Sequence, residues 1–108
     1  MENTPIQPKK RTLIDYYKLP KDLQEQLKLV YSQGFNEDLI VYKDASGKQI
    51  SALRFETDTI VYMVKMSIDQ AYKIMDDDSD FNDDYELKSS VKEDYMDKHS
   101  DADYLFDS

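Results

Sequence analysis

The spacing of apolar residues predicts a first helix near the start of the chain. Apolar side chains recur three and four positions apart, which places them on one side of a helix. This stripe consists of Leu23, Leu27, Val30 and Tyr31. Pro20 suits the first turn of a helix, and Gly34 suits the residue just past its end. We therefore expect a helix that begins at Pro20 and stops before Gly34.

Three β-rich runs follow this helix, at residues 38–44, 48–57 and 59–66. The turn between the first two runs contains Gly47, which suits a residue with positive φ, so we expect these runs to form a hairpin. A second tight turn near Thr57 and Asp58 brings the third run back along the second. The pattern therefore predicts a three-stranded antiparallel β-meander.

The third run, Thr59 to Met66, is the most apolar segment and is apolar on both faces. At the edge of a meander it would expose hydrophobic side chains on one face. Either the N-terminal segment or a second subunit would cover it, so a homodimer through Thr59 to Met66 is one expectation. The segment Arg11–Leu19 fits either a short strand or an irregular segment on the core, and the sequence leaves both open.

Two more helices are predicted after the strands. Ser67 and Gln70 match the S-x-x-Q capping box, so a helix should begin there and stop near the aspartates at 76–78, whose charge is unfavourable at a helix C-terminus. Apolar residues then recur every four positions, which predicts a third helix over residues 83–98. These residues are Leu87, Val91 and Tyr95.

Together these elements predict a single α+β domain in the order α-β-β-β-α-α, with one helix before the meander and two after it. The length of 108 residues fits one domain with one modest core. We expect the domain to cover residues 11–98. A flexible N-terminal arm at 1–10 and an acidic, flexible tail at 99–108 would flank it.

Charge is distributed very unevenly along the chain. Residues 1–75 carry 11 Lys and Arg against 10 Asp and Glu, whereas residues 76–108 carry 3 against 13. The formal net charge of −9 is thus a property of the C-terminal third. A negative field repels nucleic acids and anionic membranes and favours basic partners. We therefore expect no nucleic-acid or membrane partner.

Composition removes several classes of activity. The chain has no cysteine, which excludes disulfides, thiol catalysis and cysteine-ligated zinc and is compatible with the reducing cytoplasm, where we expect the protein. Its two glycines are too few for a phosphate-cradling loop, and we expect no cofactor. No apolar run is long enough to predict a transmembrane helix.

The acidic stretch Met75–Leu87 invites comparison with a calcium loop. An EF-hand loop needs glycine at its sixth position and glutamate at its twelfth. The register that starts at Asp76 puts Phe81 and Leu87 there, and the register that starts two residues later fails at the same two positions. We therefore interpret the stretch as a solvated acidic connector, with a weak divalent-metal site as an alternative.

No catalytic constellation is evident. The single histidine, His99, lies in a polar stretch near Asp97 and Ser100, and sequence neighbours of this kind rarely form a desolvated triad. The sequence therefore predicts a surface histidine and a protein that is not an enzyme.

These observations favour a non-catalytic interaction module that binds a basic protein through its acidic C-terminal third, with carboxylates steering and aromatic residues anchoring. An acidic inhibitor or immunity protein for a basic toxin or nuclease is one form of this hypothesis. The predicted partner-binding residues are Asp80, Asp83, Asp84, Glu86, Asp94, Tyr104 and Phe106. The alternative is a small-ligand or weak metal-binding domain, with its site either in a pocket lined by Tyr62, Met63 and Tyr72 or in the cluster at 76–84.

Overall fold

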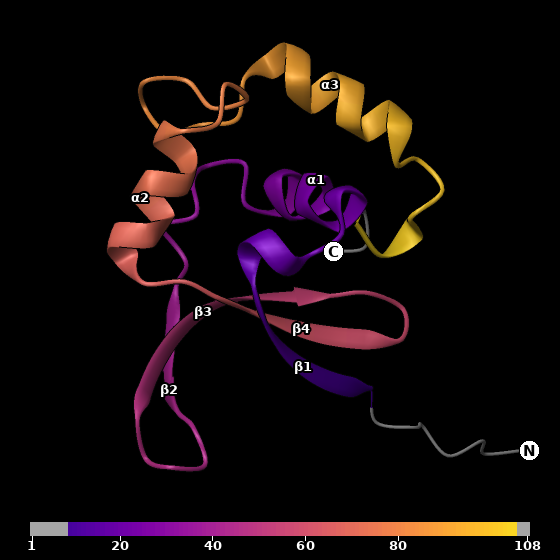
Figure 1. Cartoon of the computed structure of the whole chain (residues 1–108). Helices are drawn as coiled ribbons and strands as arrows, with labels where there is room; N and C mark the ends of the chain where they lie inside the picture. Colours follow the sequence, from indigo (N-terminus) through magenta and orange to yellow (C-terminus); the bar gives the residue numbers. More distant parts are fainter. Residues whose placement is uncertain (1–8, 106–108) are drawn as a thin grey trace, which may run out of the picture.

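A four-stranded mixed sheet forms the base of the structure, and the helices lie to one side of it (Figure 1). The computed structural model describes residues 9–105. Along the chain the elements are β1 (Lys10–Asp15), the 3₁₀ helix η1 (Tyr16–Lys18), α1 (Lys21–Val30), β2 (Ile40–Lys43), β3 (Gln49–Glu56), β4 (Ile60–Lys65), α2 (Ile68–Asp76), α3 (Ser89–Lys98) and the 3₁₀ helix η2 (Asp103–Leu105).

The N-terminal segment supplies the strand that the sequence analysis left open. β1 pairs in parallel with β4, in a register that runs from Lys10 opposite Ile60 to Asp15 opposite Lys65. The strand order is therefore β1-β4-β3-β2, and β4 is central. The antiparallel pairing of β2 with β3 and of β3 with β4 confirms the meander. The predicted three-stranded sheet is wrong because it omits β1, whose partner lies far away in the sequence.

The hydrophobic core lies between one face of this sheet and the helices. Leu53 on β3 and Val64 on β4 are opposite one another in the register, and both are fully buried. Phe35, which follows Gly34, folds back and is also fully buried, as expected for a residue that closes a helix end. Burial of a side chain of this size contributes about 2 kcal/mol. These side chains join α1, α2 and the sheet into one core.

The opposite face of the sheet is exposed only in part, since Val61 on this face is buried. Side chains alternate along a strand, so Leu13, Met63 and Arg54, which are neighbours across β1, β4 and β3, point away from the core. Leu13 leaves 48% of its surface exposed. Both edges of β4 are paired with neighbouring strands, so a second subunit could contact residues 59–66 only through a face of the sheet. The homodimer stays a prediction.

The first two helices begin and end close to their predicted positions. Ser67 and Gln70 make both hydrogen bonds of the capping box at the start of α2, and this helix ends at Asp76 with Asp77 as its cap. α1 begins after Pro20. Within residues 9–105 no helix combines the length and the apolar character needed to cross a bilayer.

The third helix is shorter than predicted, because α3 begins at Ser89 rather than near Asp83. Tyr85 has a φ of 63°, a left-handed conformation that a helix does not accommodate. The side chain of Asn82 accepts the backbone N–H groups of Asp84 and Glu86, which closes a turn. Residues 82–86 therefore form a loop that displays its carboxylates outside any helix.

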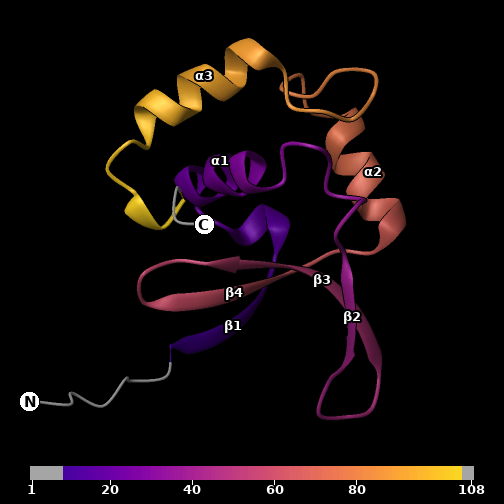
Figure 2. The ribbon, with the colours of Figure 1, turned by 180° about the vertical axis from the view of Figure 1, so that it is seen from behind.

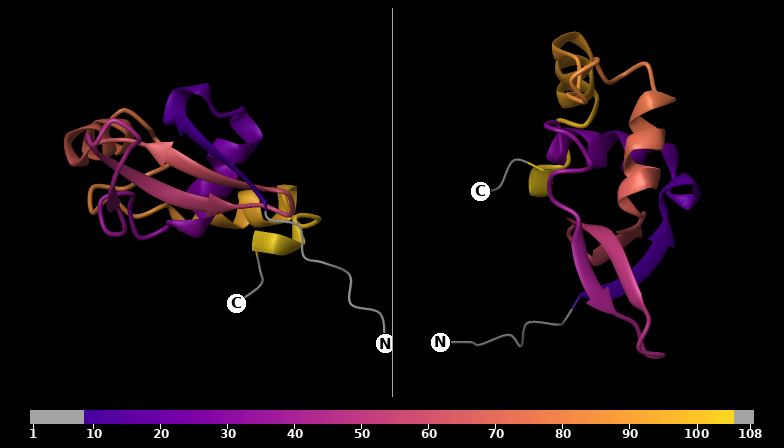
Figure 3. Two further views of the ribbon diagram at one scale, coloured as in Figure 1. Left: turned by 90° about the horizontal axis from the view of Figure 1, so that it is seen from below. Right: turned by 90° about the vertical axis from the view of Figure 1, so that its left-hand side faces the viewer.

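α3 lies on the far side of α1 from the sheet, and the β2–β3 hairpin extends away from the helices (Figures 2 and 3). Gly47 in the hairpin turn has a φ of 86°, which confirms its predicted role. The outermost layer of the molecule is thus made by the acidic part of the sequence, with α1 between it and the sheet.

Substitution of the two glycines by alanine tests the close packing around Gly34. Both have positive φ, but a Cβ on Gly34 would lie 2.6 Å from Asn36 Oδ1 and 2.9 Å from the Tyr85 carbonyl oxygen, whereas a Cβ on Gly47 meets nothing within 4 Å. We expect Gly34→Ala to lower the free energy of unfolding by about 3 kcal/mol and Gly47→Ala by about 1 kcal/mol. Urea denaturation measures both, and equal losses would contradict the close approach at Gly34.

Candidate functional site

One side of α1 is polar yet buried. Glu25, Gln26 and Lys28 expose only 3%, 7% and 7% of their surface. They are buried because α1 lies between the sheet and the acidic segment that contains α3 (Figures 1 and 2). Buried charges are tolerated when they are paired and hydrogen-bonded. The partners of these three residues define two clusters between α1 and the C-terminal third of the chain.

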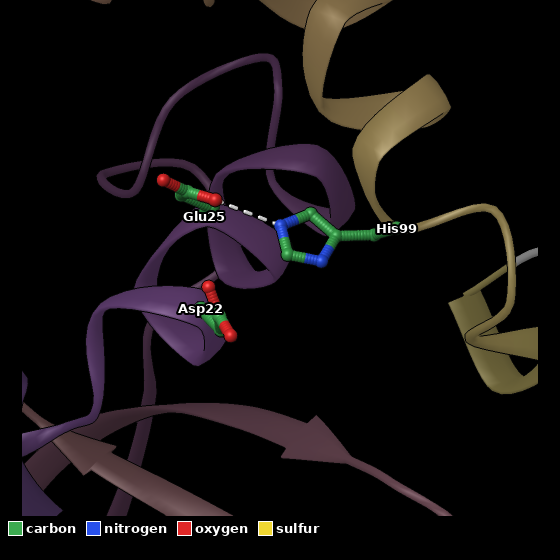
Figure 4. A group of neighbouring side chains, drawn as sticks. All are labelled: Asp22, Glu25 and His99. Atoms are coloured by element: carbon green, nitrogen blue, oxygen red, sulfur yellow. Dashed lines mark hydrogen bonds and ion pairs between the residues drawn. The ribbon is translucent and has the colours of Figure 1, made fainter.

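The first cluster surrounds His99 and is named the His99 cluster; it contains Asp22, Glu25, Gln26, Lys98, His99 and Tyr104. The imidazole lies against the Glu25 carboxylate at the C-terminal end of α3 (Figure 4). His99 Nε2 lies 2.8 Å from Glu25 Oε1, and Lys98 Nζ lies 2.9 Å from the same oxygen. Both Glu25 and His99 are buried, so this hydrogen bond is shielded from water.

Gln26 extends the His99 cluster to residue 104. The Tyr104 hydroxyl donates to Gln26 Oε1 at 2.5 Å, and Gln26 Nε2 donates to His99 Nδ1 at 3.4 Å. In this arrangement His99 Nδ1 accepts, so Nε2 carries the hydrogen that is donated to Glu25. The result is a continuous chain of hydrogen bonds that fastens residues 98–104 to α1.

The position of His99 corrects the sequence interpretation. A surface histidine was predicted, but only 5% of its surface is exposed. That prediction is wrong because the acid partner is Glu25, 74 residues earlier, and not the neighbouring Asp97 or Ser100. No serine, threonine or cysteine belongs to the cluster, so the cluster contains a buried acid–histidine pair without a nucleophile.

The electrostatics of Glu25 follow from these partners. Burial by itself raises the pKa of the Glu25 carboxyl, but the hydrogen bonds from Lys98 and His99 outweigh it, and the pKa lies below its usual value. Glu25 is therefore a carboxylate at neutral pH. A cation must stay beside it for the fold to remain stable.

The donor atoms of Asp22, Glu25 and His99 lie within 4.8 Å of one another, a separation that raises the question of a metal centre. Lys98 answers it. Its ammonium group lies 2.9 Å from Glu25 Oε1 and 3.8 Å from Asp22 Oδ1, so both carboxylates already have a cation beside them. The segment 76–84, which the structure describes completely, brings no three carboxylates together in this way.

The second cluster surrounds Lys28 and is named the Lys28 cluster. Lys28 Nζ lies 2.5 Å from Asp78 Oδ2 and 2.8 Å from Asp80 Oδ2. The Tyr95 hydroxyl from α3 donates to the same oxygen of Asp80 at 2.5 Å. Burial by itself raises the pKa of Asp80, but the hydrogen bonds from Lys28 and Tyr95 hold it below its usual value. This cluster joins α1 to both the connector and α3.

The predicted partner-binding residues separate into three groups. Asp80 and Tyr104 are engaged inside the fold, through Lys28 and Gln26 respectively. Four carboxylates are exposed: Asp83, Asp84, Glu86 and Asp94. Phe106 lies outside the described residues. The structure thus separates residues that hold the C-terminal third in place from residues that face solvent.

The segment 76–98, here named the acidic layer, runs from the end of α2 through α3 and contains ten carboxylates and three lysines. Within the described part of the chain, Asp77, Asp78 and Asp80 form ion pairs with lysines of α2 and α1. The other seven are exposed and have no ion pair there: Asp76, Asp83, Asp84, Glu86, Glu93, Asp94 and Asp97. The acidic layer therefore presents an unneutralised negative surface.

Removal of Lys28 tests the Lys28 cluster. We expect Lys28→Ala to lower the free energy of unfolding by about 3 kcal/mol, because Asp78 and Asp80 are left partly buried beside each other without a cation. Lys73→Ala is the matched control, since Lys73 pairs with Asp77 at 3.5 Å while 78% of its side chain is exposed. The control should unfold at the wild-type urea concentration. Equal effects of the two substitutions would contradict the role of burial.

Acid titration tests the His99 cluster. Because the pKa of Glu25 is lower in the folded state, its stabilisation is present above the pKa of the unfolded carboxyl and is lost as pH falls through the folded pKa. We expect the unfolding free energy of Glu25→Gln to decline less steeply than that of the wild type when the pH falls from about 5 to about 3. Parallel curves from chemical denaturation would show that Glu25 contributes no such linkage.

Comparison with known proteins adds no family to this geometry. The chain matches no protein-family model, no curated protein and no solved structure. The function of the acidic layer therefore rests on the charges, burial and contacts of its own residues.

Proposed function

We propose that the protein is a non-catalytic interaction module that binds a basic protein surface through its acidic layer. The observation that carries this proposal is the set of seven exposed carboxylates without an ion pair in the described part of the chain. Of the three lysines in the layer, Lys98 is paired with Glu25 and Asp22 of α1, so only Lys88 and Lys92 remain to offset these carboxylates.

The way α3 is attached supports a binding role for its outer side. None of its residues is buried, and it touches the rest of the chain mainly through Val91, Tyr95 and the following His99. A helix that served only to complete the core would bury more of its surface. Since the two clusters hold α3 on α1, its carboxylates are presented on a fixed scaffold, which lowers the entropic cost of binding.

The chemistry of the layer defines the partner. Carboxylates at fixed separations pair with the guanidinium and ammonium groups of a protein surface, and their field raises the rate of encounter. The residues that contact the partner are Asp83, Asp84, Glu86 and Asp94. Asp80 and Tyr104 act instead by holding the layer in place, through Lys28 and Gln26.

Neutralisation of the layer tests the proposal. The variant combines Asp83→Asn, Asp84→Asn, Glu86→Gln and Asp94→Asn, and its matched control combines Glu37→Gln, Asp38→Asn, Asp58→Asn and Asp69→Asn. The control residues are also exposed and lie outside the layer. Both variants lose four negative charges. We expect a decalysine peptide, followed by fluorescence anisotropy at low salt, to bind the layer variant about tenfold more weakly than the control.

The same two variants test whether natural partners bind through the acidic layer. Chemical cross-linking and quantitative recovery from a lysate should give basic proteins with the wild type and the control, and lose them with the layer variant. Equal losses in both variants would show that only net charge matters, and no loss would place the interface elsewhere. Point substitutions are required, because truncation after Asp78 removes Asp80, Phe81 and Leu87 from the fold.

A further inference from the structure

A cavity of about 390 Å³ lies where η1, the end of β4 and α2 meet. It is lined by Asp15, Tyr16, Tyr17, Lys18, Lys65, Met66, Gln70, Lys73 and Ile74. None of Tyr62, Met63 and Tyr72, which the sequence placed around a ligand pocket, belongs to it. The cavity opens beside the carboxyl ends of the parallel strands β1 and β4, which end at Asp15 and Lys65.

Three lysines from three different elements converge on this cavity: Lys18 from η1, Lys65 from β4 and Lys73 from α2. Lys18 lies 3.8 Å from Asp15 and Lys73 lies 3.5 Å from Asp77, and these pairs are largely exposed to solvent. Lys65 has no ion pair within the described residues. Exposed pairs of this length are weak, so the three ammonium groups remain able to bind an anion.

The floor of the cavity is apolar. Tyr16, Met66 and Ile74 are all buried, with no more than 5% of their surface exposed. Tyr17 stands at the rim with 68% of its surface exposed, and its ring packs edge-on against Tyr16 at 5.2 Å between centroids. An exposed aromatic ring above an apolar floor offers contact area to a flat or aliphatic group.

Gln70 supplies a fixed polar group in the same wall. Its side-chain oxygen accepts the backbone N–H of Ser67 at 2.8 Å, as part of the capping box of α2. This bond orients the amide and leaves its two N–H groups as donors. The cavity thus combines an apolar floor, a preoriented donor and three cations.

We propose that this cavity binds a small phosphate monoester that carries an aromatic or aliphatic group. Three lysines against Asp15 give the lining a net charge of +2, which matches the charge of about −2 that a phosphate monoester carries at neutral pH. The volume falls within the range of small-molecule sites, about 300–1,000 Å³. This site uses none of the exposed carboxylates of the proposed interface, and it adds a ligand to the proposed interaction module.

The neighbouring surface sets the orientation of the ligand. A smaller adjoining cavity shares Tyr16, Tyr17 and Ile74 but is also lined by Asp77 and Asp78, which repel an anion. On the other side, Lys18 and Lys65 also line a cavity that reaches Leu13 on β1. The phosphate therefore lies toward Lys18 and Lys65, and the organic group lies over Tyr16 and Ile74.

Titration of the full chain with phenyl phosphate, followed through ¹H–¹⁵N amide shifts, tests the site. We expect saturable shifts at Tyr17, Lys65, Gln70 and Lys73, with a Kd below about 10 mM. Inorganic phosphate and phenol, titrated separately, should each bind more weakly, because each lacks one half of the recognised chemistry. Uniform shifts at lysines all over the surface, or no saturable shift, would overturn the proposal.

Substitution of the lysines distinguishes binding of phenyl phosphate in the cavity from its nonspecific attraction to lysines elsewhere on the surface. We expect the double variant Lys18→Gln, Lys65→Gln to bind phenyl phosphate about tenfold more weakly than the wild type. The matched control is Lys43→Gln, Lys92→Gln, which removes two exposed lysines far from the cavity lining and should bind normally. Equal weakening in both variants, or binding of inorganic phosphate as tight as that of phenyl phosphate, would contradict the proposal.

Discussion

The outer half of the molecule depends on one interaction, the pairing of the buried Lys28 ammonium group with two aspartates. It faces Asp78 and Asp80 at hydrogen-bond distance, and Asp80 is shared with Tyr95 of α3. One cation thus holds both the connector after α2 and the helix that follows it. Because the Lys28 ammonium group offsets the charge of both aspartates, this part of the acidic sequence can pack on α1. The His99 cluster repeats this arrangement at the other end of α3 with Glu25 as the centre.

This arrangement gives the molecule two faces of opposite character. Lys28 and Lys98 form ion pairs inside the fold, whereas seven carboxylates of the acidic layer have no ion pair within the described residues. Lysines on η1, β4 and α2 are exposed and only weakly paired, so the cavity between these elements is basic. The net charge of −9 hides this division, because it sums over both faces. The distribution of charge on the surface therefore depends on which lysines are paired inside the fold, and not on the composition of each segment alone.

Local patterns in the sequence predicted the parts of the fold that local physics determines. The capping box at Ser67, the turn at Gly47 and the meander of β2, β3 and β4 depend on residues close together in the chain, and all three are confirmed. The parallel strand β1 was left undecided between a strand and an irregular segment, because its partner β4 is distant in the sequence. The third helix was predicted to begin too early: its apolar period starts only at Leu87, and the residues before it form a loop in which Tyr85 adopts a positive φ.

The candidate site was predictable only in its exposed part. Asp83, Asp84, Glu86 and Asp94 are exposed as an acidic stretch suggests, and their role in binding stays a prediction. The burial of Glu25, Gln26 and Lys28 could not be predicted, because polar residues on a helix normally face solvent and these three are covered only when the C-terminal third packs on α1. The lysines of the cavity come from three separate elements, and no spacing in the sequence relates them.

The parallel pairing of β1 with β4 also shapes the order in which the chain can fold. Lys10 pairs with Ile60, so β1 has no partner until fifty more residues have been made, whereas the β2–β4 meander can close from neighbouring segments. Until β1 is added, β4 is an apolar edge strand able to pair with another chain. Contacts of such long sequence separation form slowly. We therefore expect the first strand of the sequence to join the sheet last and to close an edge through which newly made copies could associate.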